Sequence, residues 1–337
     1  MQTIPTHVPV KSRAALKLVR TKAMPREEWL AVRKQGIGSS DAAAAVGLNP
    51  YKSQLELWLE KTVRDGNLPK VDPKDETSPL YWGNILEPIV AAHYSQKTGH
   101  RVRRVNAVLQ HADLSWMLAN IDREVTGSSD VQILECKTAG INGARLWKEG
   151  VPEYVQLQVQ HQLAVTGKSA ADVAVLIGGQ HLEIHRIPRN EALINRLIQL
   201  EQIFWRYVES DKPPPADGSE SAELALRSLY PEDSGSTLDF SQHPMLSATF
   251  SDLVSVRQRL ADLEKLEAQY KQSIQQVMGE ASRAKFKAGE VTWKKSKDSV
   301  SLDVVRLLKE QPDLLQRYPM SKTGSRRFVV IDATSSL

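Results

Sequence analysis

Two acidic residues and one lysine occur in an order that could support hydrolysis of a phosphodiester bond. Asp122 ends an apolar run, and Glu135 and Lys137 lie in the next apolar segment of the chain. Residues two apart on a strand point to the same face, so Glu135 and Lys137 can share one pocket. If residues 118–122 and 131–137 form neighbouring strands, Asp122 can face that pair.

The chemistry that such carboxylates favour is metal-assisted hydrolysis. Two carboxylates a few ångström apart repel each other, and Mg²⁺ can hold both ionised because it binds carboxylate and water oxygens together. The metal lowers the pKa of a bound water and neutralises charge on a scissile phosphate. A nearby lysine can position that water or offset the charge of the phosphate.

The order of these residues is more specific than the residues themselves. A Glu-x-Lys sequence occurs roughly once by chance in a chain of this length, and an exposed Glu–Lys pair on a strand is the alternative interpretation. An apolar residue before Asp122, a turn, and an apolar segment carrying Glu135 and Lys137 form the PD-(D/E)xK pattern of nucleases. Ile121 stands where that pattern usually has proline. The pattern favours a metal-dependent nuclease.

The composition is that of a globular protein without a membrane-spanning segment. The chain has 337 residues, of which 41% are hydrophobic and 25% charged, and its mean hydropathy is −0.37. It has no apolar run long enough for a transmembrane helix, so no membrane partner is expected, and its N-terminus lacks the apolar core of a secretion signal. The single cysteine, Cys136, excludes an internal disulfide and cysteine-rich zinc or iron–sulfur sites. A reducing cytoplasm fits best.

Charge is distributed unevenly, although the formal net charge is only +4. Residues 1–40 hold eight Lys and Arg against two Glu, and residues 281–337 hold twelve against six acidic residues, a surplus of +6 in each. Residues 216–240 hold six acidic residues and one Arg, a balance of −5. Basic ends around an acidic segment favour a polyanionic partner such as nucleic acid, with an ordinary solvated surface as the alternative.

Helices and strands that would position the acidic residues alternate along residues 25–210. Apolar residues spaced by three and four, with Gly or Pro near the ends, predict helices over 25–35, 42–47, 53–62, 80–99, 152–167 and 190–209. Segments rich in Val, Ile and Leu predict strands over 101–110, 115–125, 131–139, 171–179 and 181–188. This order predicts an α/β fold with a mixed central sheet flanked by helices.

The remaining segments are expected to lie outside this domain. Residues 1–24 are expected to form an N-terminal arm, and the acidic, Pro-containing residues 211–243 a linker. Residues 244–337 are expected to form a mainly helical extension with a small β element. The patterns there predict a long helix over 245–281, a hairpin near 284–295, a helix near 302–310 and a last strand over 326–332. The spacing in the long helix is too irregular to predict a coiled coil.

Four segments in this order resemble the lambda-exonuclease or YqaJ-like viral recombinase family, whose members are phage and prophage alkaline exonucleases. The resemblance covers residues 25–210 and rests on EWLAVRKQGIGSSDAAAAVGLNPYKS, YWGNILEPIV, NIDREV with ILECKTA, and YVQLQVQHQLAVTG. It implies a restriction-endonuclease-like PD-(D/E)xK core.

The resemblance implies a role for each residue of the predicted site. Asp122 and Glu135 would bind Mg²⁺ together with the main-chain carbonyl of Cys136, and Lys137 would position and activate the attacking water. Glu87, in a Trp-Gly-x-x-x-Glu segment, would reach a metal directly or through water. Without the resemblance, Glu87 is interpreted as a solvated helix glutamate.

Further residues match the family in two other helical segments. Gln158 would lie beside the metal and the nucleophile, although two neighbouring glutamines alternate with it and leave the register open. Arg33 would hold the 5′-phosphate of DNA, and Ser39 or Ser40 at a helix N-terminus would contact phosphate as well. Both serines can equally be plain helix N-caps, and the sequence does not distinguish between them.

The resemblance also implies an activity, that of a Mg²⁺-dependent 5′→3′ exonuclease on linear double-stranded DNA. It would release 5′-mononucleotides and leave 3′ single-stranded tails, using two Mg²⁺ ions that Mn²⁺ can replace. Expected partners are DNA ends, a single-strand annealing recombinase of the RecT or Bet type, and further copies of the chain in a trimeric ring. A phage- or prophage-encoded protein of the bacterial cytoplasm is expected.

Two other functions are compatible with the same residues. A structure-specific or site-specific DNA endonuclease would use the same fold and the same site. A catalytically silent protein that binds DNA ends is the other alternative, against which the complete set of Asp122, Glu135 and Lys137 argues. Cutting of circular DNA separates an endonuclease from an exonuclease.

Overall fold

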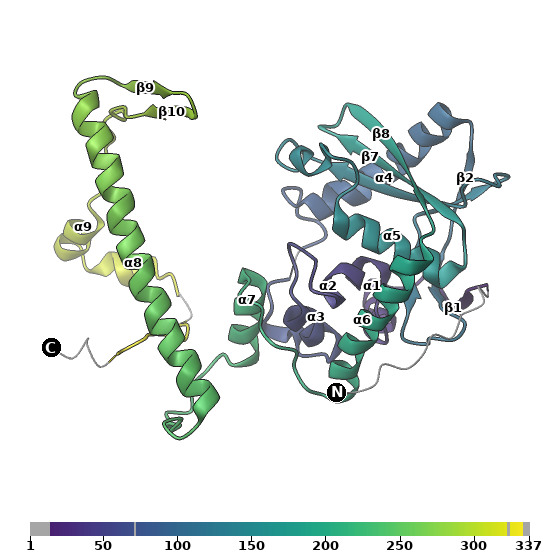
Figure 1. Cartoon of the computed structure of the whole chain (residues 1–337), viewed down its shortest axis with the longest axis horizontal. Coiled ribbons are helices and arrows are strands. Elements are labelled where there is room, and N and C mark those ends of the chain that lie inside the picture. Colours follow the sequence, from purple (N-terminus) through teal and green to yellow (C-terminus); the bar gives the residue numbers. More distant parts are fainter. Residues whose placement is uncertain (1–13, 71, 322–323, 333–337) are drawn as a thin grey trace. The chain divides into compact units, whose positions relative to one another are not determined.

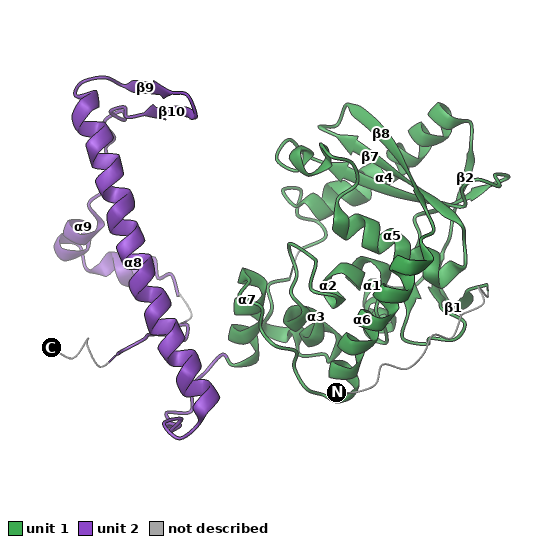
Figure 2. Cartoon of the chain, viewed as in Figure 1, with its two compact units in different colours: residues 1–230 green, residues 231–337 purple. Residues whose placement is uncertain are grey.

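The computed structural model describes residues 14–70, 72–321 and 324–332. It divides the chain into two compact units, residues 1–230 and 231–337 (Figure 2). Within the described residues, no helix combines the length and the apolar character needed to cross a membrane.

A five-stranded mixed sheet forms the centre of the first unit (Figure 1). Its strands, in the order β2-β5-β6-β7-β8, comprise Arg101–Arg104, Arg123–Thr126, Ile133–Ala139, Ala170–Ile177 and His181–Pro188. β6 and β7 run parallel, and the other neighbours are antiparallel. A parallel pair needs a crossover, and helix α5 (Glu153–Thr166) lies in the connection between β6 and β7. The predicted fold class, α/β with a mixed central sheet flanked by helices, is confirmed.

The two faces of β6 are buried against different helices. Ile133 lies in one apolar cluster with Val159 of α5. Its neighbour Leu134 lies in another cluster with Val90 of α4 (Pro79–Thr98). Because side chains alternate along a strand, every second residue of β6 that follows Ile133 also faces α5. The charged side chains of Glu135 and Lys137 therefore point toward α5.

Further helices complete the helical part of the first unit. They comprise α1 (Arg26–Lys34), α2 (Ala42–Ala45), α3 (Gln54–Lys61) and α6 (Glu191–Glu209), with 3₁₀ turns η1 (Ser39–Asp41), η2 (Asp65–Asn67) and η3 (Ala144–Trp147). α5 contacts α2 and α6, and the four alanines of α2 are buried. Polar side chains on α5 must therefore find partners within the protein, because burial without a hydrogen bond is costly.

A second, antiparallel sheet extends this unit. It contains β1 (Leu16–Arg20), β3 (Ala107–Gln110) and β4 (Leu118–Ala119). β1 lies within residues 1–24, where the sequence predicts an arm; residues 1–13 of that arm lie outside the described residues. The strand expected over 101–110 is divided between β2 and β3, which belong to different sheets.

The first unit continues to residue 230, beyond the boundary expected at 210. Helix α7 (Glu220–Leu229) lies within the expected linker 211–243 and packs on α3. Its buried side chains are Ala222, Ala225 and Ser228. The linker was predicted from the acidic, Pro-containing composition of residues 211–243, which outweighed the amphipathic spacing of this short helix.

The long helix α8 (Pro244–Met278) dominates the second unit and has no buried residue. The unit also contains the hairpin β9 (Arg283–Phe286) and β10 (Gly289–Thr292), and helices α9 (Val304–Glu310) and α10 (Asp313–Arg317). The long helix, the hairpin and the helix near 302–310 agree with the sequence prediction. The strand expected over 326–332 is wrong, because these residues pair with no strand in the described parts of the chain.

Candidate active site

Strand pairing brings the two predicted acidic residues together. In the antiparallel register of β5 and β6, Arg123 lies opposite Leu134. Asp122, which directly precedes β5, therefore comes next to Glu135. The backbone N–H of Cys136 donates to Asp122 Oδ2 at 2.8 Å. This arrangement of neighbouring chain segments is the one that the sequence pattern requires.

Lys137 lies on the same face of β6 as Glu135 and closes a small hydrogen-bonded ring. Lys137 Nζ is 2.8 Å from Glu135 Oε1 and donates to Gln158 Oε1 at 2.9 Å. Gln158 Nε2 donates in turn to Glu135 Oε1 at 2.6 Å. The position of the ammonium group is therefore set by one carboxylate and one amide.

A second glutamine of α5, Gln162, holds the other oxygen of Glu135. Its Nε2 donates to Glu135 Oε2 at 2.7 Å and to the carbonyl oxygen of Asn120 at 3.2 Å. Gln158 and Gln162 are four residues apart and share one face of the helix, whereas Gln160 bonds to backbone groups at the end of β8. The sequence left the register among Gln158, Gln160 and Gln162 open; the helical spacing of four places Gln162 beside Gln158 at the acidic pair, whereas Gln160 points elsewhere.

Burial and repulsion govern ionisation in this pocket. The pKa of Asp122 is raised to about 8, first by burial and then by the charge of Glu135, while the N–H of Cys136 acts in the opposite direction. Burial disfavours the charged form of Lys137, but its attraction to Glu135 outweighs burial and raises the pKa of the lysine. Burial also raises the pKa of the Cys136 thiol. The lysine is thus cationic, and the protonated thiol is a poor nucleophile.

The acidic pair offers oxygen atoms that suit a divalent cation. Asp122 Oδ1 has no hydrogen-bond partner among the described residues. Burial and the charge of Glu135 raise the pKa of this carboxyl, and a bound divalent cation would favour its ionised form. Across the described residues, no group of three or more His, Cys, Asp and Glu that could hold a metal is found.

Glu87 of α4 lies beside this pocket, but its carboxylate has a different partner. Glu87 Oε1 accepts a hydrogen bond from Arg123 Nη1 at 2.5 Å, and Arg104 Nη2 lies 3.9 Å from the same oxygen. Glu87 nevertheless contributes to raising the pKa of Asp122. Buried Arg123 also donates to the carbonyl oxygen of Asp122 at 2.7 Å. Sequence reasoning missed Arg123, although it directly follows Asp122 in the chain.

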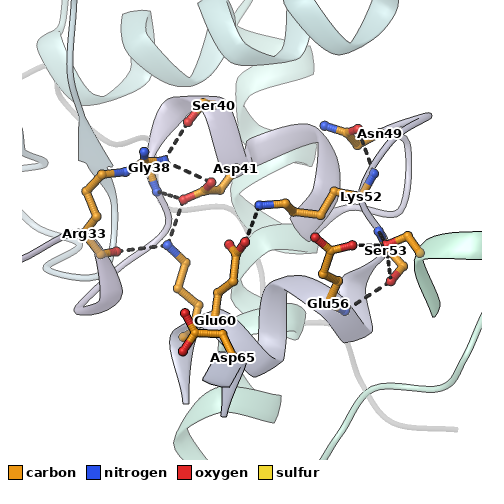
Figure 3. Close-up of polar contacts among 12 residues, drawn as sticks. Arg33, Gly38, Ser40, Asp41, Asn49, Lys52, Ser53, Glu56, Glu60 and Asp65 are labelled. Carbon is orange, nitrogen blue, oxygen red and sulfur yellow. Dashed lines mark hydrogen bonds and ion pairs between the residues drawn. The ribbon is translucent and has the colours of Figure 1, made fainter. Parts of the chain in front are cut away.

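A second polar cluster surrounds Arg33 at the end of α1 (Figure 3). Arg33 Nη2 donates to Ser40 Oγ at 2.7 Å and to Asp41 Oδ1 at 3.1 Å. Lys61 Nζ donates to Asp41 Oδ2 at 2.7 Å and to the carbonyl oxygen of Arg33 at 2.9 Å. Of the two serines that the sequence could not separate, Ser40 is the one beside Arg33. We call these four residues the cationic cluster.

Asp41 is the buried anchor of the cationic cluster. Burial alone would raise its pKa, but Lys61, Arg33 and Lys52 hold the pKa well below its usual range. Two cations in direct contact with one ionised carboxylate leave a local surplus of positive charge. The side chain of Arg33 is 22% exposed, so a phosphate can reach the guanidinium from solvent. The sequence patterns gave no sign of the ion pair between Asp41 and Lys61.

Ser39 connects the cationic cluster to the acidic pair. Its Oγ donates at 3.3 Å to the carbonyl oxygen of Asn120, which also accepts from Gln162. Asn120 precedes Asp122 by two residues. The group that could bind phosphate and the group that could bind a metal therefore lie next to each other.

The fold and this site together define a nuclease, because a mixed sheet presents Asp122, Glu135 and Lys137 in PD-(D/E)xK order beside a cationic cluster. Residues 28–169 match the model of the YqaJ-like viral recombinase domain. The chain is also 32% identical over 322 residues to the protein YqaJ of Bacillus subtilis (strain 168), covering 94% of this chain and 98% of that protein. The chain belongs to the YqaJ-like viral recombinase family, as the sequence predicts.

The similarity to the Bacillus protein includes most of the second unit, because it covers nearly the whole chain. Two solved structures each match only about half of this chain. An alkaline exonuclease, LHK-Exo from Laribacter hongkongensis, aligns with a TM-score of 0.45 and 22% identity over 55% of this chain and 93% of its own. A phage-related exonuclease from Haemophilus somnus 129PT aligns with a TM-score of 0.39 and 10% identity over 52% and 94%.

Proposed function

We propose that this chain is a divalent-metal-dependent exonuclease that degrades linear double-stranded DNA in the 5′→3′ direction. The observation that carries the proposal is the link through the carbonyl oxygen of Asn120, which joins Gln162 of the acidic pocket to Ser39 beside the cationic cluster. An enzyme that holds a terminal phosphate while it cleaves the next phosphodiester needs two such sites side by side. The products are 5′-mononucleotides and 3′ single-stranded tails.

In this proposal Asp122, Glu135 and the carbonyl of Cys136 hold two Mg²⁺ ions, which Mn²⁺ can replace. A bound divalent cation lowers the pKa of water and offsets the negative charge of the phosphate. Glu87 acts on the metal site through water, since Arg123 occupies its carboxylate. The unbonded oxygen of Asp122 and its raised pKa support this assignment.

Lys137 orients the attacking water in this proposal. Its ammonium group is charged and held by Glu135 and Gln158, so it needs little reorganisation when the substrate binds. Gln158 positions both the lysine and the carboxylate, because its amide bonds to each of them.

The terminal 5′-phosphate binds to Arg33 and Ser40 in this proposal. A guanidinium and a hydroxyl are suitable donors to phosphate oxygens, and charge-assisted bonds of this kind are strong. Ser39 positions the neighbouring backbone through its bond to Asn120. Binding of the 5′-phosphate would set the direction of degradation.

The tails fit a role in phage-type recombination by single-strand annealing. An annealing recombinase of the RecT or Bet type would coat the tail, and three copies of the chain would form a ring around the DNA. A phage- or prophage-encoded protein in the bacterial cytoplasm is the setting that we propose. Membership of a viral recombinase family supports this context.

Digestion of end-defined DNA in Mg²⁺ tests the proposal. One linear duplex is prepared with 5′-phosphorylated or 5′-hydroxyl ends, and the same DNA is supplied as a closed circle. We expect mononucleotides mainly from the phosphorylated linear duplex, and none from the Lys137→Ala variant. Cleavage of the circle would indicate an endonuclease, and end binding without any cleavage would indicate a silent end-binding protein.

A further inference from the structure

The β9–β10 hairpin of the second unit has two chemically different faces. In its antiparallel register, Ala284 lies opposite Val291 and Phe286 opposite Gly289. The backbone N–H of Trp293 donates at 3.0 Å to the residue that precedes β9, which extends the pairing by one position. Because side chains alternate along each strand, Ala284, Phe286, Val291 and Trp293 share one face.

This face exposes two aromatic rings. Phe286 is 51% exposed and Trp293 is 47% exposed, while Ala284 and Val291 between them are partly buried. The rings lie on different strands, on opposite sides of the Ala284–Val291 pair, so about 13 Å of strand separates them. Each ring can therefore stack on a different base of an extended nucleic-acid strand.

Basic side chains lie on the opposite face of the hairpin, in its turn and in the segment that follows it. Residues 283–298 contain six basic residues and two acidic ones: Arg283, Lys285, Lys287, Lys294, Lys295 and Lys297, with Glu290 and Asp298. Both acidic residues are already paired, Arg283 with Glu290 at 3.4 Å and Lys295 with Asp298 at 3.5 Å. The other four lysines form no ion pair within the described residues. They are available to phosphates.

We propose that this hairpin is a binding site for single-stranded DNA, with bases stacked on Phe286 and Trp293 and phosphates held by the lysines. A single strand presents the faces of its bases, whereas a duplex hides them, so an exposed aromatic face on a basic hairpin favours the single strand, whose phosphates would reach the long lysine side chains around the edges of the hairpin. An acidic protein surface would use the lysines but would leave two flat rings without a matching partner. That the bound strand is the tail of the digested DNA rests on the proposed function, because a 5′→3′ exonuclease produces a single-stranded tail. The binding of single-stranded DNA to the hairpin does not depend on that function.

The full chain carrying Lys137→Ala is used for the test, so that bound DNA is not degraded. Fluorescence anisotropy measures its affinity for a labelled oligothymidylate of about 20 nucleotides and for a blunt duplex. The double variant Phe286→Ala/Trp293→Ala should bind the oligothymidylate at least about tenfold more weakly, because each stacked base contributes substantially. The duplex should lose less than about threefold in affinity, since its bases are not exposed.

A matched control removes similar side chains from α8 of the same unit. Tyr270, 62% exposed, and exposed Lys265 are both replaced by alanine, and affinity for the oligothymidylate should change less than about twofold. A charge variant, Lys285→Ala/Lys287→Ala/Lys294→Ala, should reduce the slope of log affinity against log salt by about 2, since each phosphate contact on a single strand contributes about 0.7. Circular dichroism checks that the variants are folded.

Three results would overturn the proposal. They are unchanged oligothymidylate affinity in the aromatic variant, an equal loss of affinity for the duplex, and competition by polyglutamate as strong as that by unlabelled oligothymidylate. The two proposals fail separately. A chain without nuclease activity whose oligothymidylate binding still depends on the two rings contradicts only the proposed function. A chain that releases mononucleotides but binds equally well without the rings contradicts only the hairpin site.

Discussion

The acidic pocket and the cationic cluster of the first unit shift the ionisation of a buried aspartate in opposite directions. The pKa of Asp122 is raised to about 8 by burial and by Glu135. Burial also acts on Asp41, but Lys61 and Arg33 hold its pKa well below the usual range. Burial raises both pKa values, and the neighbouring charges decide the net direction: a second carboxylate beside Asp122 suits a cation, and two cations around Asp41 suit an anion.

The two pockets also differ in the groups that hold their carboxylates. Neutral amides of Gln158 and Gln162 bond to Glu135 and fix its geometry without cancelling its charge, and Lys137 is its paired cation. Asp41, in contrast, is held by charged groups that do cancel its charge. The acidic pocket therefore retains negative charge for a ligand, whereas Asp41 serves the structure.

Asp122→Asn is expected to show the largest effect, with activity and stability changing in opposite directions. The amide can still accept from the Cys136 N–H, and it removes a charge that burial and Glu135 disfavour, so the free energy of unfolding should stay equal or rise. Release of mononucleotides should fall by about 10³-fold or more, because the metal would lose a charged ligand. Nuclease assays and urea denaturation measure the two effects; activity within about tenfold of the parent would contradict the assignment.

Asp41→Asn should instead destabilise the protein by about 3–5 kcal/mol, because it leaves a buried lysine without its counter-charge. The side chain of that lysine, Lys61, is only 3% exposed. The control Asp65→Asn removes a pair with Lys34 nearer the surface and should cost less than about 1 kcal/mol. Urea denaturation compares the variants, and similar losses for both would show that Asp41 is not a structural anchor.

Acid should reproduce part of this loss in the parent protein. The pKa of Asp41 is lower in the folded than in the unfolded state, so its stabilisation is complete above the unfolded value near 4 and declines as pH falls through the folded value. The difference in unfolding free energy between the parent and Asp41→Asn should therefore shrink as pH is lowered from 7 to about 3. A constant difference would contradict the role of ionised Asp41.

Gln162→Leu should raise the Mg²⁺ concentration needed for activity about 10–100-fold, because groups that orient metal ligands have effects of this size. The matched control is Gln160→Leu, a buried glutamine on the same helix that bonds away from the acidic pair. It should change stability but not the Mg²⁺ requirement. Mg²⁺ titration of activity and calorimetric Mg²⁺ binding distinguish the two variants. An equal increase in the required Mg²⁺ concentration in both variants would show that Gln162 does not position a metal ligand.

Ser40→Ala is expected to have the smallest effect, because it removes one neutral donor from the cationic cluster. The KM for 5′-phosphorylated duplex should rise by about two- to tenfold, with little change for 5′-hydroxyl duplex. Ser39→Ala should leave this preference intact, since its hydroxyl faces Asn120. A larger loss of the phosphate preference in Ser39→Ala than in Ser40→Ala would reverse the assignment of the two serines.

Local patterns were sufficient to predict most of the first unit. The apolar periodicity located the helices and the central strands, and the spacing of Glu135 and Lys137 placed both on one face of β6. The patterns failed where a contact partner decides the outcome. Residues 326–332 contain a β-branched apolar run but have no strand to pair with in the described residues, and α7 lies in an acidic, Pro-containing segment whose composition suggested a linker.

The sequence by itself determined which residues carry charged and amide groups and how they are spaced along each element, because helix and strand periods are local properties. Only the tertiary structure decided that Gln162 rather than Gln160 joins Glu135, and that Arg123 takes the carboxylate of Glu87. These contacts join separate segments of the chain. They depend on strand register and on the rotation of helices against the sheet, which no local pattern encodes.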